Sequence, residues 1–152
     1  MKIIDGLIYD TVGFTCSCFD LLHAGQIIML QYAKARCDRL IVGLQTDPTI
    51  DRLEKNKTIQ SLEERRIQLE AVKYVDEVFT YNTEKDLYKK LLDIKPDVRI
   101  LGSDYIGKSF TGDDIDIKIY YHDRSHNYSS TNLRQKIGQY YSCKDGVLKY
   151  ER

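Results

Sequence analysis

The chain has 152 residues, of which 42% are hydrophobic and 30% are charged, with 23 basic and 23 acidic side chains. This length predicts one globular domain, because domains usually contain about 100–150 residues. No window reaches the roughly 18 consecutive apolar residues of a membrane span, and residues 1–10 lack the pattern of a secretory signal. A formal net charge of zero argues against general binding of nucleic acid or membranes, so we expect a small-molecule partner.

The cysteines predict a reducing environment. None of Cys16, Cys18, Cys37 and Cys143 forms a C-x-x-C pair with another. Cys16 and Cys18 would share one face of a strand, but a single pair does not supply the four ligands of a structural zinc site. We therefore expect free thiols and a cytoplasmic protein.

Several short apolar stretches are rich in β-forming residues and have the length of buried strands. They lie at residues 12–16, 40–44, 75–79 and 98–101. A further segment alternates apolar and polar residues from Ile115 to Tyr121, which indicates one more strand.

Segments of helical period lie between these strands. They follow His23, Ser61 and Thr83, and a last helix is predicted from Ser130 to about Gln139. Ser61 and Thr83 each precede an acidic residue by three positions, which is the pattern of a capping box. The alternation predicts a single-domain, Rossmann-like α/β fold: a doubly wound parallel sheet of about five strands with helices on both faces.

The segment between the first strand and the first helix is a candidate site, because ligands of doubly wound sheets bind at the carboxyl ends of the strands. His23 and Gln26 are neighbours on the first helical turn, and Gly25 allows a ligand to approach the backbone amides. A helix N-terminus favours phosphate. The alternative is an ordinary helix start with exposed polar residues.

Residues 102–109 match the P-loop pattern G-x-x-x-x-G-K-[ST]. A P-loop requires a helix directly after the lysine, whereas residues 110–114 are turn-like and lead into the alternating strand. We therefore discount a P-loop phosphotransferase. A dinucleotide-dependent oxidoreductase is discounted as well, because no G-x-G-x-x-G follows the first strand.

The start of the last predicted helix is a second candidate site. Ser129, Ser130 and Thr131 are most simply a helix cap, but hydroxyls and free amides beside Arg124 also suit a triphosphate. We expect this helix start to lie at the same sheet edge as the first. A polar loop and the next helix start contribute three further cations, which form either a solvated surface or phosphate ligands: Lys55, Lys57 and Arg65.

Several motifs in one order, from Val12 to about Ile137, resemble the cytidylyltransferase branch of the nucleotidyltransferase superfamily, most closely the glycerol-3-phosphate cytidylyltransferase type. They are FDLLHAG at 19–25, the run at 38–47, the segments at 64–66 and 74–78, GSDY at 102–105, and Arg124 with YSST at 128–131, which is similar to R-T-x-x-I-S-T-T. The resemblance implies transfer of CMP from CTP to a small phosphorylated acceptor, such as glycerol phosphate, an aminoalcohol phosphate or a phosphonate, with release of pyrophosphate. It also implies Mg²⁺ with the nucleotide and a homodimer, and we assign no residue as a direct protein ligand of the metal.

The resemblance also implies roles for individual residues. The expected catalytic residues are His23, Gln26, Lys57, Arg65 and Arg124. The expected nucleotide-binding residues are Cys16, Ser17, Cys18, Phe19, Asp20, Gly25, Lys55, Gly102, Asp104, Tyr105, Tyr128, Ser129, Ser130 and Thr131. The domain would span residues 11–139, between an N-terminal extension at 1–10 and a C-terminal tail at 140–152 to which we assign no function.

One departure from the resemblance bears on activity, because Gln26 occupies the position of the family's second motif histidine. Glutamine donates a neutral hydrogen bond but cannot carry the positive charge of an imidazolium. A charge-assisted hydrogen bond is about twice as strong as a neutral one. The alternative function is therefore a catalytically weakened or inactive nucleotide-binding relative. Ser17 and Cys18 replace a more usual glycine and threonine, and both are small enough to leave the turn intact.

Overall fold

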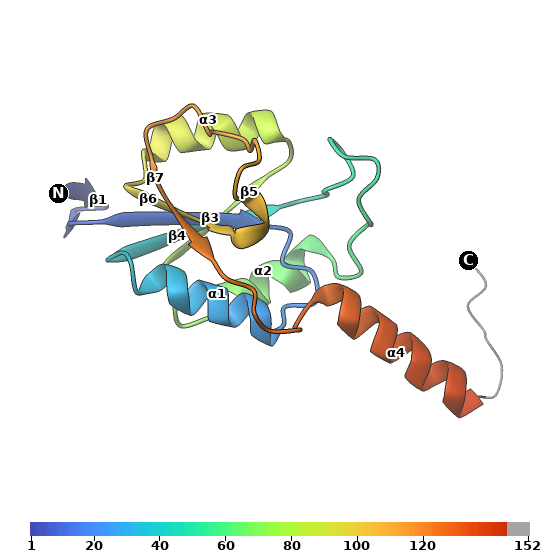
Figure 1. Ribbon diagram of the computed structural model, residues 1–152. Helices are drawn as coiled ribbons and strands as arrows, with labels where there is room; N and C mark the ends of the chain where they lie inside the picture. The colour runs from blue at the N-terminus through green and yellow to red at the C-terminus, as the bar shows by residue number, and fades with distance from the viewer. Residues whose placement is uncertain (146–152) are drawn as a thin grey trace.

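A five-stranded parallel sheet in the order β5-β4-β3-β6-β7 forms the centre of this computed structural model, which describes residues 1–145 (Figure 1). The strands are β3 (Val12–Ser17), β4 (Arg39–Gln45), β5 (Glu77–Tyr81), β6 (Val98–Gly102) and β7 (Lys118–His122). The helices are α1 (Ala24–Lys34), α2 (Leu62–Glu70), α3 (Glu84–Ile94) and α4 (Ser130–Asp145), with a short 3₁₀ helix η1 at Ser103–Tyr105. The predicted Rossmann-like α/β fold is confirmed.

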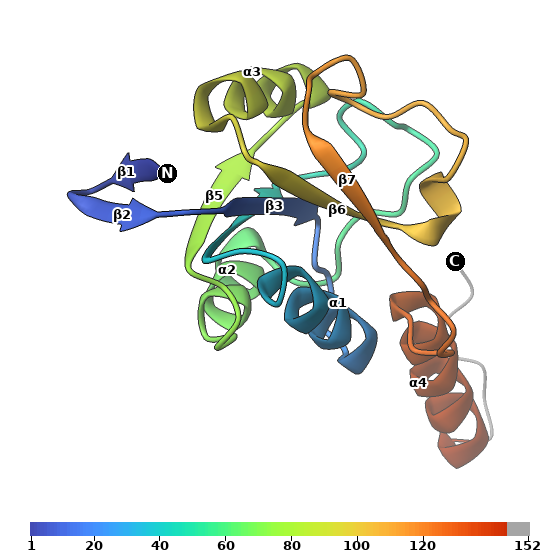
Figure 2. The ribbon, with the colours of Figure 1, turned by 60° about the vertical axis from the view of Figure 1, so that its left-hand side comes forward.

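Helices cover both faces of the sheet. In Figures 1 and 2, α1 and α2 lie on one face and α3 lies on the other. Leu30 of α1 and Leu69 of α2 pack with the strand residues of one buried cluster, while Leu87 and Leu91 of α3 pack with Phe14 in a second cluster. Because both faces are covered, every residue of β4 is buried, as is usual in parallel sheets.

The chain winds in two directions from β3. It first passes through α1, β4 and α2 to β5 at one edge, and then returns through α3 to β6 on the other side of β3. The carboxyl ends of β3 and β6 are therefore the point where the connections diverge, which is where doubly wound sheets bind ligands.

The N-terminal extension is a hairpin of β1 (Lys2–Ile4) and β2 (Leu7–Tyr9). Asp5 and Gly6 form its turn, and both have positive φ (51° and 77°), which suits a two-residue turn between antiparallel strands. Lys2 anchors the hairpin to the end of the sheet by an ion pair with Asp97 at 3.2 Å.

Three element boundaries differ from the sequence prediction. The strand expected at residues 75–79 is β5 at Glu77–Tyr81, because a turn precedes it. The last strand begins at Lys118 rather than Ile115, because a turn with Gly112 at φ +84° occupies the preceding segment. The last helix continues to Asp145, past the predicted end near Gln139 and the predicted domain boundary, because Gly138 is accommodated within it. Residues 140–145 of the predicted tail are thus helical, and residues 146–152 lie outside the described residues. Within residues 1–145, no helix is long and apolar enough to cross a membrane.

Candidate active site

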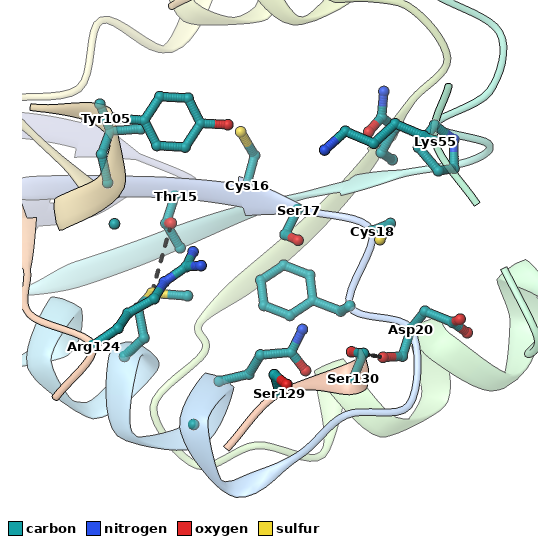
Figure 3. A pocket seen from close by; sticks show the side chains of 18 of the residues that line it. Thr15, Cys16, Ser17, Cys18, Asp20, Lys55, Tyr105, Arg124, Ser129 and Ser130 are labelled. Atoms are coloured by element: carbon teal, nitrogen blue, oxygen red, sulfur yellow. Dashed lines mark hydrogen bonds between the residues drawn. The ribbon is translucent and has the colours of Figure 1, made fainter. Parts of the chain in front are cut away.

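A cavity of about 860 Å³ opens at the carboxyl ends of β3 and β6 (Figure 3). The structure brings sixteen of the predicted site residues to its lining: His23, Gln26, Arg124, Cys16, Ser17, Cys18, Phe19, Asp20, Gly25, Lys55, Gly102, Tyr105, Tyr128, Ser129, Ser130 and Thr131. Lys57, Arg65 and Asp104 do not line it. The two helix starts that the sequence singled out therefore share one cavity.

The side chains of His23 and Gln26 cap the start of α1. His23 is the N-cap residue, its Nδ1 accepts a hydrogen bond from the Gly25 amide at 3.1 Å, and the Gln26 Oε1 accepts one from the His23 amide at 3.3 Å. Because Nδ1 is an acceptor, a neutral His23 ring carries its proton on Nε2. Both side chains thus serve as caps while they line the cavity, which combines the two interpretations that the sequence left open.

The environment of His23 favours the neutral ring. Burial, and then the nearby His126 and Arg124, lower the pKa of His23 below its ordinary value of 6.5. At neutral pH this histidine is therefore an uncharged hydrogen-bond donor.

The start of α4 closes the cavity from the other end of the chain. The Ser129 hydroxyl accepts a hydrogen bond from the Asn132 amide at 3.0 Å, as a helix cap does, and the Ser130 hydroxyl donates to the Asp20 carbonyl at 2.9 Å. In the loop before α4, the His126 ring stacks on Tyr128 with ring centroids 5.2 Å apart. These contacts fix the hydroxyl cluster next to the loop that precedes α1.

Gly25 is required by protein packing as well as by any ligand. A Cβ atom at this position would lie 2.6 Å from Cε1 of His126 and 3.0 Å from the carbonyl oxygen of Tyr128. Every other residue would therefore push the loop before α4 away from the start of α1.

The carboxylate of Asp20 is used by the protein itself. It is buried, accepts hydrogen bonds from the amides of Ile59 (2.9 Å) and Gln60 (3.0 Å), and forms an ion pair with Arg134 of α4. Burial by itself raises the pKa of Asp20, but the two amides and the Arg134 guanidinium outweigh burial and hold the pKa below 3.8. Asp20 lines the cavity, yet its position indicates a structural tie rather than the expected nucleotide ligand.

Arg65 departs most from its expected role. Its side chain is 1% exposed, and its guanidinium donates to the carbonyl oxygens of Cys18 (2.9 Å), Gln45 (2.7 Å) and Thr46 (2.6 Å). These carbonyls take up the donors of the guanidinium, and Arg65 does not line the cavity, so it holds the ends of β3 and β4 together instead of reaching phosphates. The sequence motif placed it at a helix start but could not show that carbonyl groups surround it.

Lys57 and Asp104 also lie outside the cavity lining. The Asp104 carboxylate faces Arg124 across 3.8 Å, and both side chains are more than half exposed. Asp104 can therefore orient Arg124 from outside the cavity lining.

Two cavity-lining histidines were missed by the sequence analysis. His122 ends β7, and His126 follows two residues after Arg124, so together with His23 all three histidines of the chain gather at the cavity. The Nε2 atoms of His122 and His126 are buried and have no hydrogen-bond partner within residues 1–145. Their positions in the sequence could have identified them, because they flank Arg124 at the end of the last predicted strand.

The described part of the chain offers no protein cage for a metal ion. Residues 1–145 contain no group of three or more histidine, cysteine, aspartate or glutamate side chains arranged to hold one. An ion at this site would have to bind mainly through the ligand.

Fold and site together define a Rossmann-like α/β protein whose cavity, lined by two helix starts, Arg124 and neutral donors, suits an anionic ligand. Residues 14–136 match the family model described as cytidylyltransferase-like. The chain therefore belongs to the cytidylyltransferase-like family of nucleotidyltransferases.

Curated relatives agree with this assignment. The chain is 36% identical over 146 residues to the bifunctional protein HldE of Helicobacter pylori, covering 95% of this chain and 31% of that protein. It is 36% identical over 127 residues to the bifunctional protein HldE of Caulobacter vibrioides, covering 80% of this chain and 26% of that protein. The chain thus spans less than a third of the length of these relatives.

Solved structures share the fold. A lipopolysaccharide core biosynthesis protein from Thermoplasma volcanium superposes with a TM-score of 0.55 at 23% identity, covering 86% of this chain and 88% of that one. A pantoate-beta-alanine ligase from Francisella tularensis superposes with a TM-score of 0.61 at 20% identity, covering 97% of this chain and 75% of that one.

Proposed function

We propose that the protein transfers CMP from CTP to a small phosphorylated acceptor and releases pyrophosphate. An oxygen of the acceptor phosphate attacks the α-phosphorus, and the bond from that phosphorus to the bridging oxygen of the β-phosphate breaks, with the electron pair leaving on pyrophosphate. The observation that carries the proposal is that His23 and the Ser129–Ser130 pair line one cavity although they begin the first and last helices.

The residues of the cavity support catalysis by positioning and charge neutralisation. His23 donates from Nε2 to a phosphate oxygen, and Arg124 supplies a fixed positive charge. The amides at the starts of α1 and α4 favour the remaining phosphate oxygens. His126 lines the same cavity, and its Nε2 is buried with no partner within the described residues.

Mg²⁺ would accompany the triphosphate and neutralise part of its charge. The donor set of the cavity fits such an ion only when the nucleotide supplies most ligands, since residues 1–145 provide no cluster of metal-binding side chains. We assign no side chain as a direct metal ligand.

The direct test is incubation with a nucleoside triphosphate, Mg²⁺ and a panel of phosphorylated polyols, sugars and aminoalcohols, with pyrophosphate release as the readout. CTP is the expected nucleotide. ATP is the comparison, because the Francisella tularensis ligase was solved as a complex with beta-gamma ATP. Pyrophosphate release with CTP and one acceptor is expected, and silence with both nucleotides across the panel would contradict the proposal.

The second candidate function is a nucleotide-binding relative that has lost turnover, and Gln26 is the observation that favours it. A neutral donor in place of an imidazolium can cost about 30- to 150-fold in rate. The Gln26→His variant separates the candidates. Turnover that appears only in the variant supports the second function, whereas an unchanged or lower rate shows that glutamine suffices.

We also propose a homodimer in a reducing, cytoplasmic environment. Ile137 and Tyr141, each 51% exposed, lie four residues apart on one face of α4 and suit an interface. Cys16, Cys18, Cys37 and Cys143 are all free, which suits a reducing compartment. Light scattering should give about twice the 17.8 kDa mass of the chain.

A further inference from the structure

The cavity extends to the second face of the sheet. Successive residues of a strand point to opposite faces. Thr15 donates to the Ile100 carbonyl and lies against Met29 of α1, whereas Cys16 packs with the cluster on the α3 face. In Figure 3, Cys16 and Tyr105 lie on one side of β3, while Arg124 and Ser129 lie on the other. The proposed triphosphate ligands occupy only one of these two sides.

Arg99 of β6 lines the cavity on the α3 side and has no counter-ion. Its side chain is 3% exposed, it donates to the Thr111 carbonyl and weakly to the Cys16 sulfur at 4.0 Å, and its Nε has no partner. None of the ion pairs within residues 1–145 includes Arg99. This guanidinium is thus buried without an ion-pair partner among these residues.

The thiol of Cys16 and the phenol of Tyr81, which pack on the α3 side of the sheet, do not supply a negative charge to Arg99. Burial raises the pKa of the Cys16 thiol, and burial also raises the pKa of the Tyr81 hydroxyl, so both side chains are neutral at pH 7. The carboxylate of Glu84 lies nearby, but it is paired with Arg52 at 3.0 Å and accepts a hydrogen bond from the Thr111 hydroxyl at 2.6 Å.

The turn at residues 110–112, directly after the segment that resembles a P-loop, forms part of the wall around Arg99. The rings of Phe110 and Phe14 lie 5.2 and 5.6 Å from its guanidinium carbon, in the range of cation–π contacts. Gly112 permits this wall, because it has φ +84° and a Cβ atom there would lie 2.7 Å from Leu91. This turn therefore holds the Arg99 side chain in place.

We propose that Arg99 binds the anionic group of the acceptor, a phosphomonoester, on the α3 side of the cavity; this rests on the proposed function. A buried charge without a counter-ion is unfavourable, and a phosphate would satisfy it with charge-assisted hydrogen bonds. Lys55 lines the cavity as well and adds positive charge to it, whereas Arg52 is paired with Glu84. The nucleotide then lies toward Arg124 and the acceptor toward Arg99, so that the two reactants meet at the carboxyl end of β3.

The test is calorimetric titration with glycerol 3-phosphate, inorganic phosphate and glycerol of the wild type and of three variants. Arg99→Met should weaken binding of both phosphate ligands about 10- to 100-fold, and Arg99→Lys should weaken it less. Arg36→Met is the matched control, because Arg36 stacks on Tyr32 outside the cavity lining and its loss should leave binding unchanged. Glycerol carries no phosphate, so neither the wild type nor any variant should bind it measurably.

Thermal unfolding separates ligand binding from a structural role. Removing an uncompensated buried charge in favour of a side chain of similar volume should leave the melting temperature of Arg99→Met equal to or above that of the wild type. If Arg99→Met fails to fold, the phosphate affinity of Arg99→Lys is compared with that of the wild type instead, and a lower affinity supports the proposal. Equal phosphate affinity in wild type and Arg99→Met, or no phosphate binding by the wild type, would overturn the proposal.

These outcomes are distinguishable from failure of the proposed function. Binding is measured without turnover, so loss of phosphate binding in Arg99→Met supports the subsite even where no pyrophosphate is released. Conversely, turnover with CTP and an unchanged acceptor KM in Arg99→Met would leave the proposed function standing and remove the subsite.

Discussion

The Ser130 hydroxyl donates a hydrogen bond to the backbone carbonyl of Asp20 at 2.9 Å, across 110 residues of the chain. This contact ties the start of α4 to the loop that leads into α1, and the ion pair of Arg134 with Asp20 reinforces it. A single cavity lined by the first and last helices depends on this tie. The variants below ask which residues build the cavity and which ones bind in it.

Substitution by methionine should lower the stability of the protein at Arg65 and the nucleotide affinity at Arg124. Arg65→Met leaves the carbonyls of Cys18, Gln45 and Thr46 without their donor and should lower the free energy of unfolding by about 2–4 kcal/mol. The Arg124 side chain is 59% exposed, so Arg124→Met should change stability by less than about 0.5 kcal/mol while nucleotide affinity falls about 10-fold. Urea unfolding and nucleotide titration measure the two effects. Normal stability with lost nucleotide binding in Arg65→Met would restore the role that the sequence predicted.

Asp20→Asn should destabilise the protein by about 1.5–3 kcal/mol, because a neutral amide weakens the bonds from Ile59, Gln60 and Arg134. The pKa of Asp20 is below 3.8, so its carboxylate contributes stability above that pH and loses it as the pH falls through the lower folded-state pKa. The difference between wild type and variant should therefore shrink on acidification. Asp93→Asn, at an exposed position of α3, is the control and should be neutral. An Asp20→Asn protein as stable as that control contradicts the structural tie.

Gln26→Glu should separate helix capping from ligand binding. A glutamate oxygen can accept from the His23 amide as the Gln26 Oε1 does, and a negative charge is favourable in the first turn, so stability should be unchanged or higher. The same charge would repel phosphates in the cavity, so nucleotide affinity should fall at least about 10-fold. Gln31→Glu, on the exposed side of α1, is the matched control and should leave the affinity unchanged. Undiminished affinity in Gln26→Glu would mean that the phosphates bind elsewhere.

The free energy of unfolding should decrease as the pH falls from about 7 to about 5.5, partly through His122. Burial, and then the nearby His126 and Arg124, lower the pKa of His122 below 6.5. The unfolded chain therefore binds the proton first, and stability is lost as the pH falls below 6.5, at no more than about 1.4 kcal/mol per pH unit for this residue. His122→Gln removes the titrating group and should flatten the dependence, whereas parallel curves for wild type and variant would exclude His122 as a source.

Local patterns in the sequence predicted local structure correctly. The capping box of Ser61 and Glu64 forms with distances of 3.2 and 2.7 Å, and the start of α3 is capped by the pair Thr83 and Asp86. The rejection of a P-loop is also confirmed, because a 3₁₀ helix and turns follow Gly102. These features depend on atoms within a few residues of one another, so periodicity and spacing are enough to identify them.

The surroundings of a side chain that come from distant parts of the chain could not be predicted from the sequence in this way. Arg65 matches a motif residue, but its donors are taken up by the carbonyls of Cys18 and Gln45, which reach it from two separate strand ends. Arg99 lies in an ordinary apolar strand sequence, and only the packing of residues 110–112 around it leaves its charge buried and uncompensated.

The sequence by itself determined the order of strands and helices, their caps and the family, since these follow from periodicity and short motifs. Only the tertiary structure decided which charged side chains face the cavity and which are taken up by the protein, as for Arg124 and Arg65. The physical reason is that the free energy of a charge depends on the atoms that surround it after folding, and those atoms come from distant parts of the chain.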